Sequence, residues 1–375
     1  MTARGERTPL PELARLFLKL GTFGFGGPAA HIGMMEDEIV RRRGWLTREA
    51  FLDLVGAVNL IPGPNSTEMA IHVGRERAGW RGLLVSGTCF ILPAALIVGI
   101  IAWAYVRFGS LPAAAGLLYG VKPVVIAVVL QALWGLGRTA VKARWLAALG
   151  AAAVAATALG VNELLVLGVA GAVGVARRER RGTPVAAFAV RAGAVTVTPW
   201  ALGLWPLFGV FLKVGAVLFG SGYVLLAFLR ADLVQRLHWL TERQLLDAVA
   251  VGQVTPGPLF TTATFVGYVL HGAPGAAVAT VGIFLPAFVY VGLSGAILPR
   301  LRRSPAARSA LDAVNVASLA LMVVVTWQLA GAALVDAWTI ALAAVAAVLL
   351  LRYRLNSSWL VLGGAVVGVA VRALR

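Results

Sequence analysis

The sequence predicts an all-α polytopic membrane protein of two inverted structural repeats, each with a broken first helix and a re-entrant Pro-Gly-Pro helical hairpin. Three observations lead to this prediction: 59% of the residues are apolar, they fall into long blocks, and the segment 17–134 recurs at 211–327. Only 13% of the residues are charged, against about 25% in soluble proteins. Blocks such as 83–106 and 117–136 are long enough to cross a hydrocarbon core of roughly 30 Å.

The repeat is in register over most of its length. The pairs that lie 194 positions apart include Phe17/Phe211, Lys19/Lys213, Gly21/Gly215, Asp53/Asp247 and Pro62-Gly63-Pro64/Pro256-Gly257-Pro258. After a one-residue deletion, an offset of 193 relates Leu92-Pro93 to Leu285-Pro286 and Trp134 to Trp327. A long repeat of apolar segments interrupted by Gly and Pro is typical of secondary transporters, whose substrate sites lie at the interruptions.

The repeat divides the chain into a first membrane repeat (1–176), a basic inter-repeat linker (177–200) and a second membrane repeat (201–375). We expect each repeat to contain a broken helix, a hairpin and four further membrane helices. In the first repeat these are 10–41, 47–78, 82–107, 112–138, 145–160 and 162–176. In the second they are 203–236, 241–271, 275–299, 309–333, 335–351 and 357–373.

The hairpins are expected to be re-entrant. The arm 47–61 holds 15 residues, or roughly 22 Å of helix, which reaches past the midplane but does not span. Pro62 and Pro64 cannot donate backbone hydrogen bonds, so the helix has to stop there. Irregular backbone at that depth is tolerated only inside protein or beside a water-filled cavity.

The orientation follows from the loops. Counting the broken helix as one crossing gives each repeat five crossings, or seven if both hairpin arms cross, and either odd number inverts the second repeat. Lys and Arg concentrate in the loops 41–43, 75–81, 138–144, 177–191, 300–308 and 352–354. The positive-inside rule predicts that these loops are cytoplasmic, with both termini outside. This distribution, and not nucleic-acid binding, explains the net charge of +17.

The sequence carries no pattern that indicates catalysis. It lacks a His-Glu-x-x-His motif, a Gly-x-Ser-x-Gly motif and a Walker loop, so we expect a transporter driven by gradients and not an enzyme. The one cysteine, Cys89, supports neither a disulfide nor a metal cluster, and no cofactor is expected. The oligomeric state stays open, a homodimer being compatible with the sequence.

The hairpin tips are the main candidate for the substrate site. The first tip spans residues 59–67 and the second spans residues 253–262. A new helix starts at each tip, and its free N–H groups favour an anion. The candidate residues are Asn59, Gly63, Asn65, Ser66 and Thr67 in the first tip and Gln253, Thr255, Gly257, Thr261 and Thr262 in the second. The alternative is that each Pro-Gly-Pro is only a tight turn between two helices.

The breaks in the first helices are a second candidate. They contain Gly26 and Gly27 in one repeat and Gly220, Ser221 and Gly222 in the other. Small residues let the backbone approach a ligand closely. Close packing of helices through small residues explains them equally well.

Three lysines within apolar segments and one glutamate beside the first tip are further candidates. Lys19 and Lys213 are repeat partners and serve either in coupling or, as the favoured interpretation, as snorkelling side chains. Lys122, whose repeat partner is Asn315, is a better candidate for a buried substrate-binding cation. Glu68 follows the first tip and is a candidate proton-coupling carboxylate, the alternative being an ion pair with Arg75 or Lys122.

The doubled motifs resemble the chromate ion transporter family along essentially the whole chain. The residues that carry the resemblance are Phe25 to Gly33, the Trp-Leu-Thr at 45–47 and 239–241, and the two segments 59–64 and 253–258. The resemblance implies a bacterial or archaeal inner-membrane protein that exports chromate and confers chromate resistance. The second copy departs from the first at Ser221-Gly222 and at Gln253, so the expected site is only pseudo-symmetric. Transport of sulfate or another oxyanion, or a passive anion channel, are the alternatives.

Overall fold

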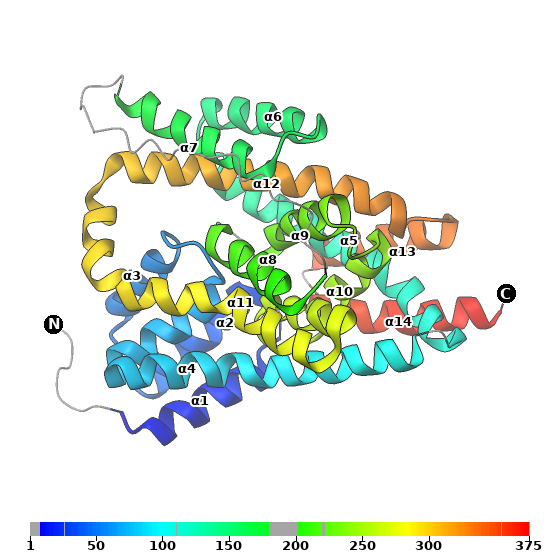
Figure 1. Ribbon diagram of the computed structural model, residues 1–375, viewed down its shortest axis with the longest axis horizontal. Helices are drawn as coiled ribbons and strands as arrows, with labels where there is room; N and C mark the ends of the chain where they lie inside the picture. The colour runs from blue at the N-terminus through cyan, green and yellow to red at the C-terminus, as the bar shows by residue number, and fades with distance from the viewer. Residues whose placement is uncertain are drawn as a thin grey trace.

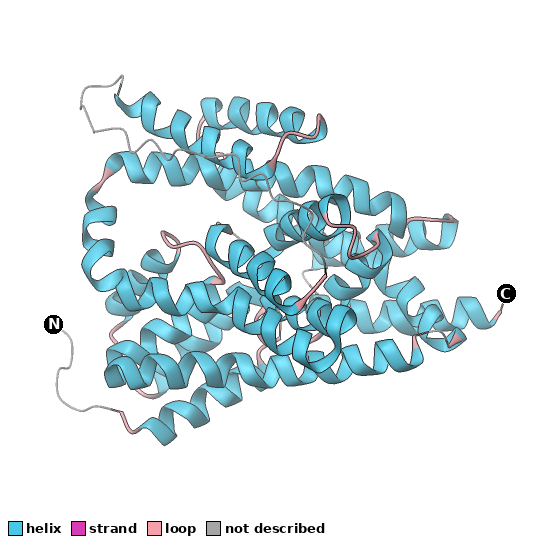
Figure 2. Cartoon of the chain, viewed as in Figure 1, coloured by secondary structure: helices cyan, strands magenta, loops and turns pink. Residues whose placement is uncertain are grey.

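A computed structural model describes residues 8–374 of the chain, except residues 26, 110, 180–201, 220–221 and 354. The described part is almost entirely helical and contains no strand (Figure 2). Most of the predicted linker and the candidate residues Gly26, Gly220 and Ser221 lie outside the described residues.

The helices of the two halves follow the same order. The first half contains α1 (Leu10–Phe23), α2 (Gly27–Glu36), the π-helix η1 (Asp37–Arg42), α3 (Arg48–Val58), α4 (Asn65–Phe108), α5 (Pro112–Ala140), α6 (Arg144–Ala158) and α7 (Glu163–Glu179). The second half contains α8 (Leu204–Val217), the 3-10 helix η2 (Gly222–Val224), α9 (Leu225–Leu229), the π-helix η3 (Arg230–Arg236), α10 (Glu242–Val254), the 3-10 helix η4 (Leu259–Thr261), α11 (Thr262–Arg303), α12 (Pro305–Ala333), α13 (Ala337–Tyr353) and α14 (Ser357–Ala373).

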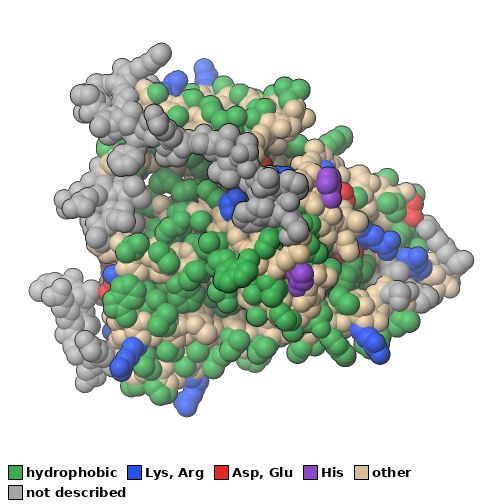
Figure 3. Space-filling view, viewed as in Figure 1, with side chains coloured by type: hydrophobic (Ala, Val, Ile, Leu, Met, Phe, Trp, Pro, Cys, Tyr) green, Lys and Arg blue, Asp and Glu red, His purple; other side chains and the backbone are tan. Residues whose placement is uncertain are grey.

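The composition of these helices is that of a multi-pass membrane protein. Within the described residues, four apolar helices are long enough to cross a bilayer: 65–108, 116–140, 259–295 and 305–333. Broad areas of hydrophobic side chains cover the face of the molecule seen in Figure 3. Extensive exposed apolar surface of this kind fits a lipid-facing surface.

The sequence predicted that the first element of each half is one broken helix that crosses the membrane once. The structure differs from this prediction. The segment 10–42 folds back on itself, since Lys19 Nζ lies 2.8 Å from Glu38 Oε1 and Arg43 Nη1 lies 2.6 Å from Glu12 Oε1. The N-terminal end of α1 therefore lies beside the basic loops, where Arg77 Nε donates to Thr8 Oγ1 at 2.9 Å. The predictions that this element crosses once, and that the N-terminus lies opposite the basic loops, were wrong because these ion pairs hold both arms at one end.

The second arm of each hairpin continues into the next long helix. The sequence predicted separate elements ending near 78 and starting near 82, but α4 runs through both with a sharp kink at Ala78-Gly79. The kink in α11 lies at His271-Gly272, which is the repeat position. Gly79 and Gly272 have φ values of +62° and +61°, so the two kinks have the same backbone geometry.

The long helices α4 and α11 cross at the centre and run antiparallel. Arg75, before the kink of α4, donates to the carbonyl of Val291 late in α11. At the other end the ring of Tyr105, late in α4, packs at a tilt against that of Phe265, early in α11, with ring centroids 5.1 Å apart. Each first half-helix packs against the long helix of its own half, α1 on α4 and α8 on α11.

The last helices are exchanged between the halves. α5 of the first half packs against α13 and α14 of the second, and α12 of the second packs against α6 and α7 of the first. Figure 1 shows α6 and α7 lying over α12. The exchange joins the two halves into one body.

The α5–α14 contact depends on small residues. Gly116 and Gly120 of α5 face Gly364 and Gly368 of α14, and a Cβ on Gly120 would overlap the carbonyl oxygen of Gly364. Two Gly-xxx-Gly stripes therefore bring the helix backbones into direct contact, which is a common way to pack helices in lipid.

We expect Gly364→Leu to separate α5 from α14 and to destabilise the protein by about 1–3 kcal/mol, because the added side chain overpacks the contact. Gly363→Leu is the matched control, since a Cβ at Gly363 meets nothing within 4 Å. Thermal unfolding in detergent measures the difference. Equal melting temperatures for the two variants would contradict the assigned contact.

Candidate functional site

The two Pro-Gly-Pro tips meet the opposite half of the molecule at its centre. The backbone N–H of Gly63 donates to the carbonyl oxygen of Leu218 at 2.8 Å, and that of Gly257 donates to the carbonyl oxygen of Gly24, also at 2.8 Å. Leu218 ends α8 and Gly24 ends α1. The two hydrogen bonds join repeat-related positions, so each tip closes on the break in the other half's first helix.

Glycine is required at both tips. Gly63 and Gly257 have φ values of +139° and +90°, which residues with a Cβ rarely adopt. A Cβ on Gly63 would lie 3.9 Å from Ala287 Cβ, and one on Gly257 would lie 2.5 Å from Ala94 Cβ. Ala94 and Ala287 are repeat partners on α4 and α11, so each tip also packs on the long helix of the opposite half.

One feature of this crossing is asymmetric. His31 Nε2 lies 2.9 Å from the carbonyl oxygen of Gly24, which therefore accepts from both His31 and Gly257. The repeat position of His31 is Leu225, so the Leu218 carbonyl has no equivalent imidazole. His31 thus supports the break at which the second tip docks.

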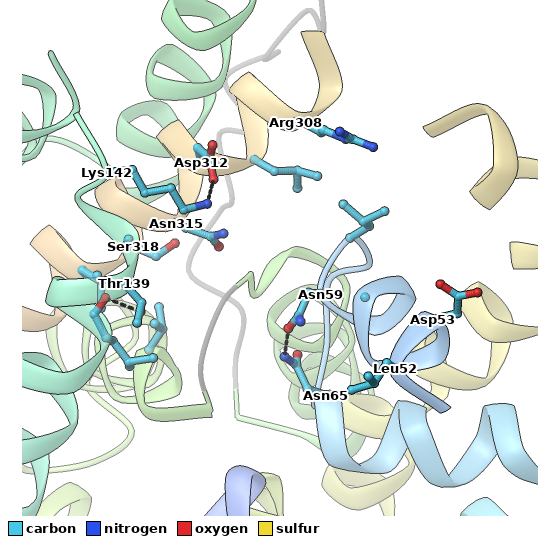
Figure 4. Close-up of a pocket in the computed structure, with 17 residues that line it drawn as sticks. Leu52, Asp53, Asn59, Asn65, Thr139, Lys142, Arg308, Asp312, Asn315 and Ser318 are labelled. Carbon is cyan, nitrogen blue, oxygen red and sulfur yellow. Dashed lines mark hydrogen bonds and ion pairs between the residues drawn. The ribbon is translucent and has the colours of Figure 1, made fainter. Parts of the chain in front are cut away.

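A cavity of about 710 Å³ lies beside the first tip (Figure 4). We call it the vestibule. Its polar lining residues are Asp53, Asn59, Asn65, Thr139, Lys142, Arg308, Asp312, Asn315 and Ser318. They come from α3, from the start of α4, from the end of α5 with the following loop, and from α12. Since Lys142 and Arg308 belong to the basic loops, the vestibule opens at the basic end of the molecule.

The lining of the vestibule mixes amides with balanced charges. Asn65 Nδ2 donates to Asn59 Oδ1 at 2.8 Å, and Lys142 Nζ lies 2.8 Å from Asp312 Oδ1. In Figure 4, Arg308 lies across the cavity from the asparagine pair. Amide and hydroxyl donors with compensated cations can bind an anion without holding it permanently.

Toward the opposite end of the molecule lies a buried cluster of polar side chains that we call the Asp247 cluster. Lys122 Nζ lies 2.9 Å from Asp247 Oδ1, with only 9% and 1% of the two side chains exposed. The hydroxyl of Tyr105 donates to Asp247 Oδ2 at 2.9 Å. Further out, the hydroxyl of Tyr119 donates to Asp336 Oδ2 at 2.5 Å.

The Asp247 cluster and the vestibule are built from repeat-related positions. Asp53 corresponds to Asp247, Asn315 to Lys122, and Asp312 to Tyr119. Asp53 and Asn315 therefore line a cavity, whereas their partners Asp247 and Lys122 are buried.

The candidate residues of the tips have different surroundings. Asn59 and Asn65 line the vestibule, whereas Ser66 and Thr67 are buried behind them. In the second tip, the hydroxyls of Thr255, Thr261 and Thr262 donate to the carbonyl oxygens of Val251, Pro258 and Leu259 at 3.0, 2.8 and 2.8 Å. Gln253 is partly buried, and Gly27 and Gly222 begin the segments after the two breaks.

The three lysines that the sequence singled out are paired with acids. Lys19 and Arg42 both contact Glu38, and Lys213 and Arg236 both contact Asp232, so the same lysine–acid–arginine arrangement occurs twice. Lys122 is paired with Asp247 and does not line the vestibule. Within the described residues, no three His, Cys, Asp or Glu side chains are grouped as a metal site.

Several residues that line the vestibule were not predicted from the sequence as site residues: Asp53, Thr139, Lys142, Arg308, Asp312, Asn315 and Ser318. A signal for two of them was present, because Asp53 and Asn315 are the repeat partners of Asp247 and Lys122. The others come from helix ends and loops that only the exchanged packing brings to the first tip.

The comparison with known families agrees with this duplicated architecture. The sequence matches the family described as chromate transporter over residues 11–175 and again over residues 205–369. The chain belongs to the chromate transporter family. The two matches cover both halves, so the resemblance noted from the motifs is confirmed.

Several curated relatives are similar along most of their length. A chromate transport protein of Cupriavidus metallidurans is 34% identical over 97% of this chain and 94% of its own. A probable chromate transport protein of Synechococcus elongatus is 31% identical over 82% and 81%. A chromate transport protein of Pseudomonas aeruginosa is 32% identical over 75% and 71%. No solved structure shows significant similarity to the chain.

We expect Gly63→Ala and Gly257→Ala each to destabilise the protein by about 1–3 kcal/mol, because alanine is strained at these φ values. Gly99→Ala is the control: a Cβ there meets nothing within 4 Å, and alanine favours the helix by up to about 1 kcal/mol. Thermal unfolding measures both effects. Tip variants as stable as Gly99→Ala would refute the tip geometry.

We expect Lys122→Ala to destabilise the closed end by about 3–5 kcal/mol, because it leaves Asp247 buried without its cation. Lys122→Ala combined with Asp247→Asn should recover most of that loss, since no buried charge then remains. A double-mutant cycle on unfolding free energies measures the coupling. Additive effects would mean that the two side chains do not form the pair.

Proposed function

We propose that the protein is a secondary active transporter that exports chromate across the cytoplasmic membrane by alternating access and thereby confers chromate resistance. The observation that carries this proposal is the pairing of an open vestibule with a closed, repeat-related counterpart. Membership of the chromate transporter family supports chromate as the substrate. The curated relatives that carry chromate transport in their names support it further.

The membrane arrangement that we propose follows from the antiparallel α4 and α11. If the membrane lies perpendicular to both helices, the two halves are inverted repeats, and the two Pro-Gly-Pro hairpins enter it from opposite faces. The basic loops would face the cytoplasm of a bacterial or archaeal cell. The vestibule and both tips come from one chain, so a homodimer is not needed to complete the site.

Alternating access would exchange the states of the two ends. α3 and α12 would close around Asp53 and Asn315, while α10 and α5 would separate Asp247 from Lys122. In the present state chromate would enter from the cytoplasm, which is the side required for export. A closed Asp247 cluster also favours a carrier over a passive channel, whose pore would be open at both ends.

The substrate would bind at the part of the vestibule formed by the first tip, which we call its floor. Asn59, Asn65 and the free backbone N–H groups at the start of α4 would donate hydrogen bonds to the oxyanion. Arg308 and Lys142 would draw a dianion into the mouth by their charge. Sulfate has the same shape and charge, so it is the natural competitor and the second candidate substrate.

The test is uptake of radiolabelled chromate into proteoliposomes, with and without excess sulfate. We expect saturable, potential-driven transport, and we expect Asn59→Ala and Asn65→Ala each to reduce it at least about tenfold by removing a donor worth about 1.5 kcal/mol or more. Asn162→Ser is the control, because it removes an exposed amide that caps α7 but keeps an oxygen in its place.

Three outcomes would contradict parts of this proposal. Unsaturable anion flux would indicate a channel. Sulfate transport without chromate transport would reassign the substrate. Full activity of both asparagine variants would remove the binding site from the vestibule floor.

A further inference from the structure

Glu68 is a buried carboxyl group behind the first tip. It lies in the first turn of α4 and is 0% exposed. Neither carboxylate oxygen has a hydrogen-bond partner among the described residues. A Cβ on Gly63 would overlap Glu68 Oε1, so the carboxyl group packs directly against the Pro-Gly-Pro turn.

The cations that the sequence suggested as partners are engaged elsewhere. Arg75 contacts Val291 and Ser294 of α11, and Lys122 pairs with Asp247. No described lysine or arginine forms an ion pair with Glu68. In this position an ionised carboxylate would be a buried charge without compensation, which is strongly unfavourable.

The titratable groups around Glu68 are few. Tyr290 of α11 is close enough to interact with it electrostatically, and its hydroxyl donates to the carbonyl oxygen of Ala216 at 3.0 Å. His72 lies one turn further along α4, and the buried His31 lies on α2, which also packs on α4. These neighbours are one phenol and two imidazoles, and they include no lysine or arginine.

Glu68 is also close to the proposed anion site. Asn65, which lines the vestibule, precedes it by one helical turn on the same face of α4, or roughly 4.5 Å along the axis. An oxyanion at the floor and an ionised Glu68 would repel each other across this distance through low-dielectric protein. The anion therefore favours the protonated form of Glu68.

The second half has no equivalent carboxyl group. At the offset that relates the two tips, Thr262 takes the place of Glu68. Its hydroxyl is satisfied by the carbonyl oxygen of Leu259. The chain thus has one ionisable side chain at this position in its two tips.

We propose that Glu68 is a proton-binding site linked to the anion site, and that one proton is bound and carried together with the oxyanion. This inference rests on the proposed function. A dianion that leaves with one proton carries a net charge of −1, which an inside-negative membrane potential still drives outward.

The test is the pH dependence of oxyanion binding by the full-length protein in detergent, measured by calorimetry with chromate and, separately, with sulfate. For one linked proton we expect the affinity of the wild type to fall about tenfold per pH unit on the alkaline limb. Glu68→Gln, which is permanently neutral and of the same shape, should bind tightly with no such dependence. Glu68→Thr, the residue of the second half, should behave in the same way.

The control is Glu76→Gln, which alters an exposed carboxyl group two turns further along α4 and should keep the wild-type pH dependence. Proton flux into vesicles carrying a pH indicator gives a second readout. It should accompany chromate transport by the wild type and disappear in Glu68→Gln, while chromate exchange continues.

The outcomes separate the inference from the proposed function. Chromate binding that is equally pH-dependent in the wild type and in Glu68→Gln, or pH-independent in the wild type, would overturn the proton site alone. Sulfate binding with the expected pH dependence, but without chromate binding, would reassign the substrate and retain the proton site. Binding of neither anion at any pH would overturn both.

Discussion

The fold depends on how its central backbone is hydrogen-bonded. Where α1, α3, α8 and α10 end, backbone polar groups lose their helical partners in the interior of the protein and need new ones. The reciprocal hydrogen bonds from Gly63 to Leu218 and from Gly257 to Gly24 satisfy part of this demand. Because each bond joins one half to the other, neither half can complete its own centre. The exchanged packing of α5 on α14 and of α12 on α7 extends the same interdependence to the periphery.

This arrangement has a direct consequence for transport. A tip that closes on the opposite half can also act as the floor of a cavity, and the first tip does so through Asn59 and Asn65. The buried Lys122–Asp247 pair closes the other end at its repeat-related positions. A buried ion pair contributes little net stability, but separating it is costly. Under the proposed alternating access, such a pair suits a contact that is specific in one state and broken in the other.

Much of the architecture could be predicted from the sequence because the duplication is visible in it. Residues of the two copies pair at offsets of 194 and 193 positions, and this pairing identified the two tips, the two breaks and the polar residues beside them. The fold-back of residues 10–42 could not be predicted, because it depends on pairs such as Lys19–Glu38 between segments that each resemble ordinary membrane helices. The role of Lys122 was equally hidden: an isolated lysine in an apolar segment suggests a substrate contact, and only the packing of α10 against α5 reveals Asp247 as its partner. Arg308 and Lys142 reach the vestibule through the exchange of helices, which no local pattern encodes.

The most direct test of the account is the distance across the vestibule when the Asp247 cluster is weakened. Spin labels at Leu52→Cys and Leu311→Cys, both on the vestibule wall, in a Cys89→Ser background, report this distance by pulsed electron paramagnetic resonance. Alternating access predicts one long distance in the otherwise unaltered protein and an added, shorter population when Lys122→Ala and Asp247→Ala are introduced together. An unchanged distance distribution, in a variant whose outer end has become accessible to water-soluble reagents, would contradict it.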